Sequence, residues 1–211
     1  MRVSELVKSG PAIALLVPAG ALCGCTCHPP EEVDEVFIPG GTFTIGHPPF
    51  AEHGGCVAFG EPCNDFAPPH QVTLRPYFIN KFEVTFGEYR ACGQAGFCEP
   101  DPTAGAFREK LRDPAFANFP MLGAPKDAAE RYCQWKGKRL LTEAEWERAA
   151  RGGLTGEEYP WGGERNPDGK WMNNIWQGTF PEKHTVQDGF EGTSPVKSFA
   201  PNGYGLYDMS G

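Results

Sequence analysis

The sequence predicts an α+β domain in which loops make up much of the chain, and three observations support this prediction. Early segments alternate polar and apolar residues, which is typical of half-buried strands. Later segments carry the start and stop signals of amphipathic helices. The chain also contains 27 glycines and 21 prolines among its 211 residues, and beyond Gly153 it reads as loops and short strands with many aromatics. Such a composition is typical of a loop-rich fold.

Strands are expected in the first part of the domain. Residues 42–46 follow a turn at 39–41 and alternate polar with apolar side chains, and residues 71–74 alternate in the same way. The apolar stretch 77–79 predicts a more fully buried strand. Residues 47–70, between these strands, are rich in glycine and proline and are expected to form a long loop.

Three helices are predicted from their end signals. Two begin with a capping box, in which a threonine and a later glutamate satisfy each other's backbone N–H groups: Thr85 with Glu88, and Thr142 with Glu145. The other begins near Pro125, which suits a first helical turn, and stops at Gly137. The apolar spacing gives the last two helices buried faces, formed by Ala128, Tyr132 and Trp135 and by Trp146, Ala149 and Ala150.

Aromatic residues are frequent near the end of the chain and are expected to pack in the core, because loop-dominated domains need such side chains to bury area. They are Trp161, Trp171, Trp176, Phe180, Phe190, Phe199, Tyr204 and Tyr207. His184 lies among them and is expected to be an exposed loop residue.

The first 24 residues predict a lipoprotein-type signal peptide. Arg2 and Lys8 give a positive start, and the apolar run at 11–22 is too short to span a bilayer as a helix. The run ends in Leu-Cys-Gly-Cys, which resembles a lipobox, so Cys25 is expected to be the first mature residue and to carry the lipid. An ordinary secretory signal cut nearby is the alternative. Thr26 after the lipidated cysteine favours the outer membrane over retention elsewhere in the envelope.

Both alternatives for the leader predict an exported protein of the cell envelope, in the outer membrane or the periplasm. Residues 25–35 carry several acidic side chains and two prolines and are expected to form a linker, followed by a domain at 36–211. The formal net charge of the chain is −8. Because an acidic surface repels phosphate backbones, no nucleic-acid partner is expected.

Five cysteines of the domain suggest bridges and one buried thiol. Cys92 with Cys98, and Cys56 with Cys63, each enclose a short loop that a disulfide could close, as expected for an exported protein. A zinc site of these four thiols is the alternative, although their spacings exceed the roughly two to four residues usual between zinc ligands. Cys133 is expected to be a small buried hydrophobe or half of a disulfide with a later residue; a nucleophile or copper ligand is the alternative.

One loop offers oxygen ligands for calcium. Asn174 supplies an amide oxygen and Asp188 a carboxylate, while Ile175 and Phe190 can turn backbone carbonyls toward an ion, since nearby glycines let the loop curl. From these residues alone, a solvated loop with turn-forming asparagine and aspartate explains the pattern better.

Several unusual sequence words follow one another in the last third of the chain. They occupy residues 139–153, 159–162, 174–178, 188–190 and 201–211, and include Tyr-Pro-Trp-Gly, Asn-Ile-Trp-Gln-Gly and Pro-Asn-Gly-Tyr-Gly-Leu-Tyr-Asp. In this order they resemble the formylglycine-generating enzyme, or sulfatase-modifying factor, family. The resemblance covers roughly residues 36–211 and implies a C-type-lectin-like fold with long loops.

The same resemblance implies a structural calcium ion bound by Asn174, Ile175, Asp188 and Phe190. Asp208 and Gly211 match the start of a second calcium site, whose other ligands follow in the family. Enzymes of the family oxidise a sulfatase cysteine to formylglycine with molecular oxygen and a copper-binding pair of cysteines.

That cysteine pair has no counterpart here, because no cysteine follows Cys133. The domain is therefore expected to be incomplete at its carboxyl end and to contain no catalytic residue. Copper binding is expected only if later residues carry the cysteine pair. Residues 124–126, Ala-Pro-Lys, also replace the Val-Ser-Trp usual in the family. Two functions remain: an exported relative of these enzymes with a sulfatase-type protein or peptide as partner, or a non-catalytic lectin-like binding module on a lipid anchor. A cytoplasmic sulfoxide-synthase type is less compatible with an exported chain.

Overall fold

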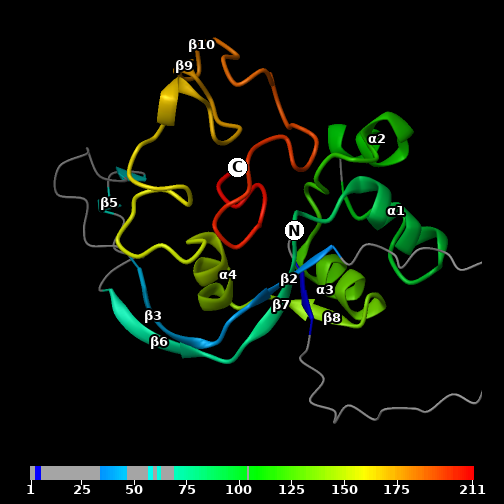
Figure 1. Cartoon of the computed structure of the whole chain (residues 1–211). Coiled ribbons are helices and arrows are strands. Elements are labelled where there is room, and N and C mark those ends of the chain that lie inside the picture. The colour runs from blue at the N-terminus through cyan, green and yellow to red at the C-terminus, as the bar shows by residue number, and fades with distance from the viewer. Residues whose placement is uncertain (1–2, 6–33, 47–56, 59–60, 63–68, 104) are drawn as a thin grey trace, which may run out of the picture.

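The computed structural model describes residues 3–5, 34–46, 57–58, 61–62, 69–103 and 105–211. Cys25, Cys56 and Cys63 lie outside these residues, as do most of the predicted signal peptide and acidic linker. In Figure 1, helices α1, α2 and α3 gather on one side of the molecule, while the long loops beyond helix α4 occupy the other. The mixture of short strands, helices and long loops confirms the predicted α+β, loop-rich class.

The largest sheet is antiparallel, with its four strands in the order β2-β7-β1-β8. These strands are β1 (Val3–Glu5), β2 (Glu35–Ile38), β7 (Tyr77–Asn80) and β8 (Lys138–Leu140). The buried strand expected at 77–79 is confirmed, since Tyr77 and Ile79 are almost fully buried. Strand β1 belongs to the segment predicted as a signal peptide, yet it lies between β7 and β8 and pairs with both.

Three two-stranded sheets complete the β-structure of the described residues. Strand β3 (Gly41–Ile45) pairs with β6 (His70–Leu74), as the alternating patterns at 42–46 and 71–74 predicted. Two small hairpins join β4 (Val57–Ala58) to β5 (Glu61–Pro62) and β9 (Gly178–Thr179) to β10 (Lys183–His184). The first of these hairpins lies where the sequence predicted only a loop.

The helices are α1 (Phe86–Gln94), α2 (Ala106–Arg112), α3 (Lys126–Trp135) and α4 (Glu143–Ala150), with short 3-10 turns at Pro114–Phe116 and Pro167–Gly169. Both capping boxes are present, at Thr85 and Thr142. Pro125 is the residue that precedes α3 rather than a member of its first turn. In the parts of the chain that the structure describes, no helix combines the length and apolar character needed to cross a membrane.

Two hydrophobic cores stabilise the domain. One lies among the first helices and contains the buried side chains of Val84, Phe86, Tyr89, Leu111, Met121 and Tyr132. The other joins strands β2 and β7 to α4 and to the end of the chain, through Ile38, Tyr77, Ile79, Ala149, Leu206 and Met209. The carboxyl-terminal loop is therefore packed on the central sheet although it has no regular structure of its own.

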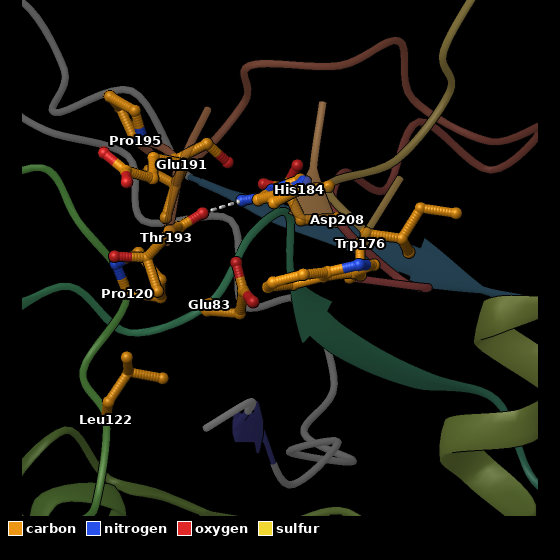
Figure 2. Close-up of a pocket in the computed structure, with 15 residues that line it drawn as sticks. Glu83, Pro120, Leu122, Trp176, His184, Glu191, Thr193, Pro195 and Asp208 are labelled. Carbon is orange, nitrogen blue, oxygen red and sulfur yellow. Dashed lines mark hydrogen bonds between the residues drawn. The ribbon is translucent and has the colours of Figure 1, made fainter. Parts of the chain in front are cut away.

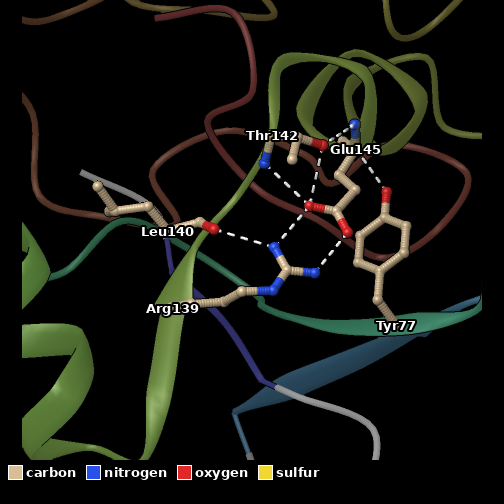
Figure 3. Close-up of polar contacts among 5 residues, drawn as sticks. All are labelled: Tyr77, Arg139, Leu140, Thr142 and Glu145. Carbon is tan, nitrogen blue, oxygen red and sulfur yellow. Dashed lines mark hydrogen bonds and ion pairs between the residues drawn. The ribbon is translucent and has the colours of Figure 1, made fainter.

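The buried face of helix α4 differs from the prediction at one residue. Ala149 and Ala150 are buried as expected, but Trp146 is 43% exposed and Glu145 is buried instead. Glu145 faces inward because its carboxylate binds the guanidinium of Arg139 and the backbone N–H of Thr142 (Figure 3). Trp146 then lies on the outer side, where it lines a pocket of about 390 Å³ with Met209.

A second buried ion pair crosses the central sheet. The Lys138 ammonium contacts the Glu35 carboxylate and donates to the Asn80 side-chain oxygen at 2.7 Å. Both charged side chains are largely shielded from solvent. Glu35, which the sequence placed in the acidic linker, is thus the first residue of β2 and part of the folded sheet.

Helix α4 also holds the turn that connects β2 to β3. The Arg148 guanidinium donates to three consecutive backbone carbonyls, those of Pro39, Gly40 and Gly41, at 3.1 to 3.3 Å. Gly40 is required there, since an added Cβ would lie 2.9 Å from the Pro76 ring. One turn further along the helix, Arg151 donates to the Gly46 carbonyl at 2.9 Å. Two arginines therefore fix both ends of β3 to one helix.

Candidate functional site

A pocket of about 360 Å³ opens beside the long loops (Figure 2). Four of the predicted calcium ligands line it, namely Asn174, Ile175, Asp208 and Gly211. Asp188 and Phe190, the other two predicted ligands, are not among its lining residues. Segments far apart in the sequence therefore meet at this pocket.

Asp188 organises the loop that forms one wall. One carboxylate oxygen, Oδ2, accepts hydrogen bonds from the Ile175 backbone N–H at 3.2 Å and from the Gln177 side-chain amide at 2.7 Å. The other, Oδ1, accepts from the Phe190 backbone N–H at 3.0 Å. The structure thus brings Ile175, Asp188 and Phe190 together, and the carboxylate is the centre of this group.

Gln177 is a member of the site that the sequence did not single out. It is 3% exposed, and both ends of its amide are hydrogen-bonded. Its Nε2 donates to the Ile175 carbonyl and to Asp188 Oδ2, while its Oε1 accepts from the backbone N–H groups of Gln187 and Asp188. The only sequence signal for it is its place within the Asn-Ile-Trp-Gln-Gly stretch, since glutamine is usually an exposed residue.

Asn174 connects this loop to the end of the chain. Its side-chain amide donates to the Gly192 carbonyl at 2.7 Å, and its backbone N–H donates to the Gly211 carbonyl at 3.3 Å. Gly211 has φ +117°, and an added Cβ would lie 3.0 Å from the Asn174 carbonyl oxygen. A glycine is therefore needed where these two backbones meet.

Asp208 reaches the same pocket from a strained backbone position. It has φ 54°, in the left-handed region, and its Oδ2 accepts from the Lys197 backbone N–H at 2.7 Å. The neighbouring Tyr207 N–H donates to the Lys81 carbonyl at 2.8 Å. This hydrogen bond connects the segment to the end of strand β7. The residues that follow contact the Asn174 loop, since the Ser210 carbonyl accepts from the Asn173 side-chain amide and the Gly211 carbonyl from the Asn174 N–H.

Aromatic side chains next to the pocket are less buried than expected. Trp176 is 39% exposed and Phe180 is 76% exposed, which contradicts their prediction as core residues. The Trp176 ring stacks on the His184 ring at 4.4 Å between centroids (Figure 2). His184 is held in place, because its Nδ1 lies 3.3 Å from the Gln177 backbone nitrogen. It is therefore an ordered part of the loop and not a free surface histidine.

The described cysteines have structural roles. Cys92 and Cys98 form a disulfide with a Cα–Cα distance of 5.3 Å, which confirms that prediction and excludes them as zinc ligands. Cys133 is a free, buried thiol on α3, as its interpretation as a small hydrophobe predicted. Burial raises the pKa of this thiol to about 11, so it is protonated at neutral pH.

No group of three or more histidine, cysteine, aspartate or glutamate side chains is arranged to hold a metal ion within the described ranges. The Asp188 carboxylate is surrounded instead by N–H donors, namely the backbone N–H groups of Ile175 and Phe190 and the Gln177 amide.

Comparison with known proteins identifies the family. The profile of the sulfatase-modifying factor enzyme 1-like domain matches residues 26–211. The formylglycine-generating enzyme of Streptomyces coelicolor is 35% identical over 240 residues, covering 95% of this chain and 73% of the relative. That of Thermomonospora curvata is 36% identical over 221 residues, covering 86% and 70%. The chain therefore belongs to the sulfatase-modifying factor, or formylglycine-generating enzyme, family.

Another relative has a different name. The "inactive C-alpha-formylglycine-generating enzyme 2" of Mus musculus is 46% identical over 215 residues, covering 83% of this chain and 65% of the relative. Among solved structures, CarF matches 84% of this chain and 76% of its own at 21% identity and a TM-score of 0.39. That score is too low to support any conclusion about this chain.

Proposed function

We propose that this chain belongs to an exported formylglycine-generating-enzyme-type protein, whose activity is the oxidation of a sulfatase cysteine to formylglycine. Membership of the family, with similarity to two bacterial formylglycine-generating enzymes over most of the chain, is the observation that carries this proposal. The partner is a sulfatase or a peptide of similar sequence. An acidic chain with a net charge of −8 is not suited to nucleic acid.

The chemistry needs a copper-binding pair of cysteines, because copper(I) prefers soft thiolate ligands. The described cysteines do not fit that role. Cys92 and Cys98 are joined in a disulfide, and Cys133 is buried and protonated. We therefore propose that the described residues serve as a scaffold and a binding surface. The copper-binding cysteine pair of an active enzyme would lie outside them.

The activity is tested by expressing the complete reading frame that encodes this chain with a sulfatase substrate. Mass spectrometry of the substrate's active-site peptide distinguishes cysteine from formylglycine. A host that lacks its own converting activity is required, and the substrate expressed alone is the control. Conversion above that control supports the enzyme. An unmodified substrate cysteine, although the expressed protein is folded and copper-loaded, would contradict it.

A non-catalytic binding module is the second candidate. The mouse relative, 46% identical over 215 residues, is named an inactive enzyme, which supports a non-catalytic role as the second candidate. In this case the protein binds the sulfatase peptide but leaves its cysteine unchanged. Fluorescence anisotropy with a labelled peptide separates the two functions, because binding without conversion identifies the module.

We further propose that calcium binds in the Asp188 loop and stabilises it. Asp188 contributes the charge, and the carbonyls of Ile175 and Phe190 with the amide oxygen of Asn174 contribute neutral ligands. Two of these oxygens, on Ile175 and Asp188, already converge on one donor, the Gln177 amide. This convergence supports the fit of the donor set, since calcium takes roughly six to eight oxygen ligands from carboxylates, carbonyls and water.

Calcium should therefore raise the thermal midpoint of the chain, and Asp188→Ala should abolish the rise. The measurement is differential scanning fluorimetry in chelator and in excess calcium, with Asp168→Ala, on another loop, as the matched control. A parent chain whose midpoint ignores calcium would remove this part of the proposal. The second set, Asp208 and Gly211, is proposed as part of a further calcium site that needs ligands beyond these two.

Export and lipidation at Cys25 complete the proposal. They rest on the positive start, the short apolar run and the lipobox-like motif of the sequence. A lipid on Cys25 would hold the protein at the outer membrane or elsewhere in the cell envelope.

A further inference from the structure

The Gln177 side-chain amide lies between two oxygens that a calcium ion in this loop would need to share. Nε2 donates simultaneously to the Ile175 carbonyl and, at 2.7 Å, to Asp188 Oδ2. Both acceptors are predicted ion ligands. A donor that bridges them makes the same pair of contacts that a cation would make.

The amide cannot easily give up this position. Gln177 is 3% exposed, so its N–H groups have almost no access to water. Its orientation is fixed from the other side, because Oε1 accepts from the Gln187 N–H at 2.8 Å and from the Asp188 N–H at 3.4 Å. A half-turn of the amide would place N–H groups against these two backbone donors and leave all of them unsatisfied.

We propose that Gln177 holds the place of the ion: its Nε2 occupies the position between the Ile175 carbonyl and the Asp188 carboxylate in the calcium-free loop, and an entering ion has to displace it. The inference rests on the proposed calcium site. Gln177 is a positioning residue in this account. It keeps the loop ordered without calcium, and the hydrogen bonds that it loses on displacement weaken calcium binding.

The loop geometry separates this role from simple packing. Two functions are divided between the two ends of one amide: Oε1 orders the backbone at 187–188, and Nε2 competes with the ion. Gln177→Glu preserves the acceptor end and the shape of the side chain but replaces the donor by a second carboxylate oxygen. Gln177→Met removes both ends while keeping a side chain of similar length.

The two substitutions therefore have opposite expected effects on calcium binding. In Gln177→Glu, the new carboxylate repels Asp188 without calcium, and both carboxylates can bind the ion when it is present. The midpoint in chelator should fall by several degrees, and the calcium dissociation constant should decrease by about tenfold, because added ligand charge strengthens calcium sites. In Gln177→Met, the loop loses its order, and the midpoint should fall in chelator and in calcium alike.

Gln187→Glu is the matched control. It makes the same change in the same loop, but the Gln187 side chain is exposed and only its backbone N–H takes part in the site. It adds one negative charge to the same loop but gives the ion no new ligand. Its midpoints and calcium affinity should resemble those of the parent.

The experiment measures midpoints by scanning fluorimetry in chelator and calcium, and calcium dissociation constants by isothermal titration calorimetry. Terbium luminescence sensitised by the adjacent Trp176 provides an independent reading of ion binding. The unsubstituted chain gives a further test, because displacement should shift the Gln177 side-chain NH₂ signals in nitrogen-proton NMR spectra and increase their exchange with water. This reading does not depend on the folding of any variant.

The outcomes separate the inference from the calcium proposal on which it rests. If the parent binds calcium and Gln177→Glu binds it no more tightly than Gln187→Glu does, or if the Gln177 amide signals ignore calcium, the inference is overturned and the calcium site stands. If only Gln177→Glu responds to calcium, no ion displaces the amide in the natural loop, and both the inference and the native calcium site are overturned. A lack of response in every protein overturns both.

Discussion

At the scale of single residues, the Glu145 carboxylate joins two elements that are separate in the sequence. It accepts from Arg139 Nη1 and Nη2 at 2.7 and 2.6 Å, and from the Thr142 backbone N–H at 2.9 Å. Burial alone would raise the pKa of Glu145, but these donors outweigh it and hold the pKa below its usual value. The Tyr77 hydroxyl donates to the Glu145 backbone carbonyl nearby (Figure 3).

This carboxylate makes the stability depend on acid. A lowered pKa in the folded state means that the stabilisation is fully present above the unfolded value, near 4.5, and is lost as the pH falls through the lower folded value. Glu145→Gln should cost on the order of 1–3 kcal/mol at neutral pH and should flatten the loss of stability below about pH 4.5. Urea titrations between pH 3 and 7 measure both effects.

Glu143→Gln is the matched control for this change, since Glu143 occupies the same first turn of α4 but is exposed. It should retain the acid dependence of the parent. An equal flattening in both variants would show that the effect comes from general charge and not from the buried pair.

Cys133 gives a second prediction for a single residue. Because its pKa is raised to about 11 and its side chain is buried, it should resist alkylation by iodoacetamide near pH 8 in the folded protein. Adding urea should expose it to rapid modification. Peptide mapping by mass spectrometry follows this one cysteine, and fast labelling under native conditions would contradict the buried position.

Residue identities in the site were predictable only in part. Ile175, Asp188 and Phe190 were expected together as calcium ligands. The structure joins them through the backbone N–H groups of Ile175 and Phe190, which donate to the Asp188 carboxylate, and not through the carbonyls that the prediction names. Gln177 was missed because a glutamine has no pattern that marks it as buried. Its burial depends on four hydrogen bonds of its amide to Ile175, Gln187 and Asp188, which spacing in the sequence does not reveal.

At the scale of elements, the disulfide closes the loop that follows helix α1. It joins Cys92, in the last turns of the helix, to Cys98, six residues later. The enclosed loop leaves Phe97 63% exposed beside Trp135 of α3, at 6.5 Å between ring centroids. The bridge therefore fixes the end of α1 near α3.

Replacing Cys92 and Cys98 together by alanine should lower the free energy of unfolding by about 2–3 kcal/mol, because a bridge of this size restricts the unfolded chain. Urea denaturation of the variant and of the parent measures the difference. The parent under strong reductant should resemble the variant. If the double replacement left the unfolding midpoint unchanged, the bridge would have no stabilising role.

Predictability at this scale follows the strength of local signals. Helices α1 and α4 were predicted because their capping boxes are local hydrogen-bond patterns, and both boxes are present. Helix α2 was missed, and it starts at Gly105 without a side-chain cap. Strand β8 was also missed, since its three residues pair only with β1 among the described strands and carry no alternating apolar pattern of useful length. Trp146 was misassigned because the Arg139–Glu145 pair decides which face of α4 is buried.

At the scale of the whole molecule, the role that the sequence predicts for the amino-terminal segment differs from its place in the structure. The sequence predicts that residues 1–24 are a removable leader, whereas Val3–Glu5 lie in the central sheet between β7 and β8. Removal of the leader would take β1 with it. Strand β8 would then keep its place through the Lys138 contacts with Glu35 and Asn80 and through the packing of α3.

The lipid anchor is tested in a bacterial host supplied with labelled palmitate. Label should enter the chain, and Cys25→Ser should prevent its incorporation. Cys27→Ser is the matched control, since Cys27 lies just after the motif and is not its acceptor. Incorporation that survives Cys25→Ser would show that another residue carries the lipid, and no incorporation in the parent would indicate an ordinary secretory leader.

The hydrogen bonds from the Arg148 guanidinium to the 39–41 turn also affect the order of folding during biosynthesis. Donor and acceptors are separated by 107 to 109 residues. The turn therefore emerges from the ribosome long before the guanidinium that secures it, and long-range closures of this kind are slow. For the export that we propose, a delay in locking the amino-terminal strands would keep the nascent chain extended, which is the form that translocation channels accept.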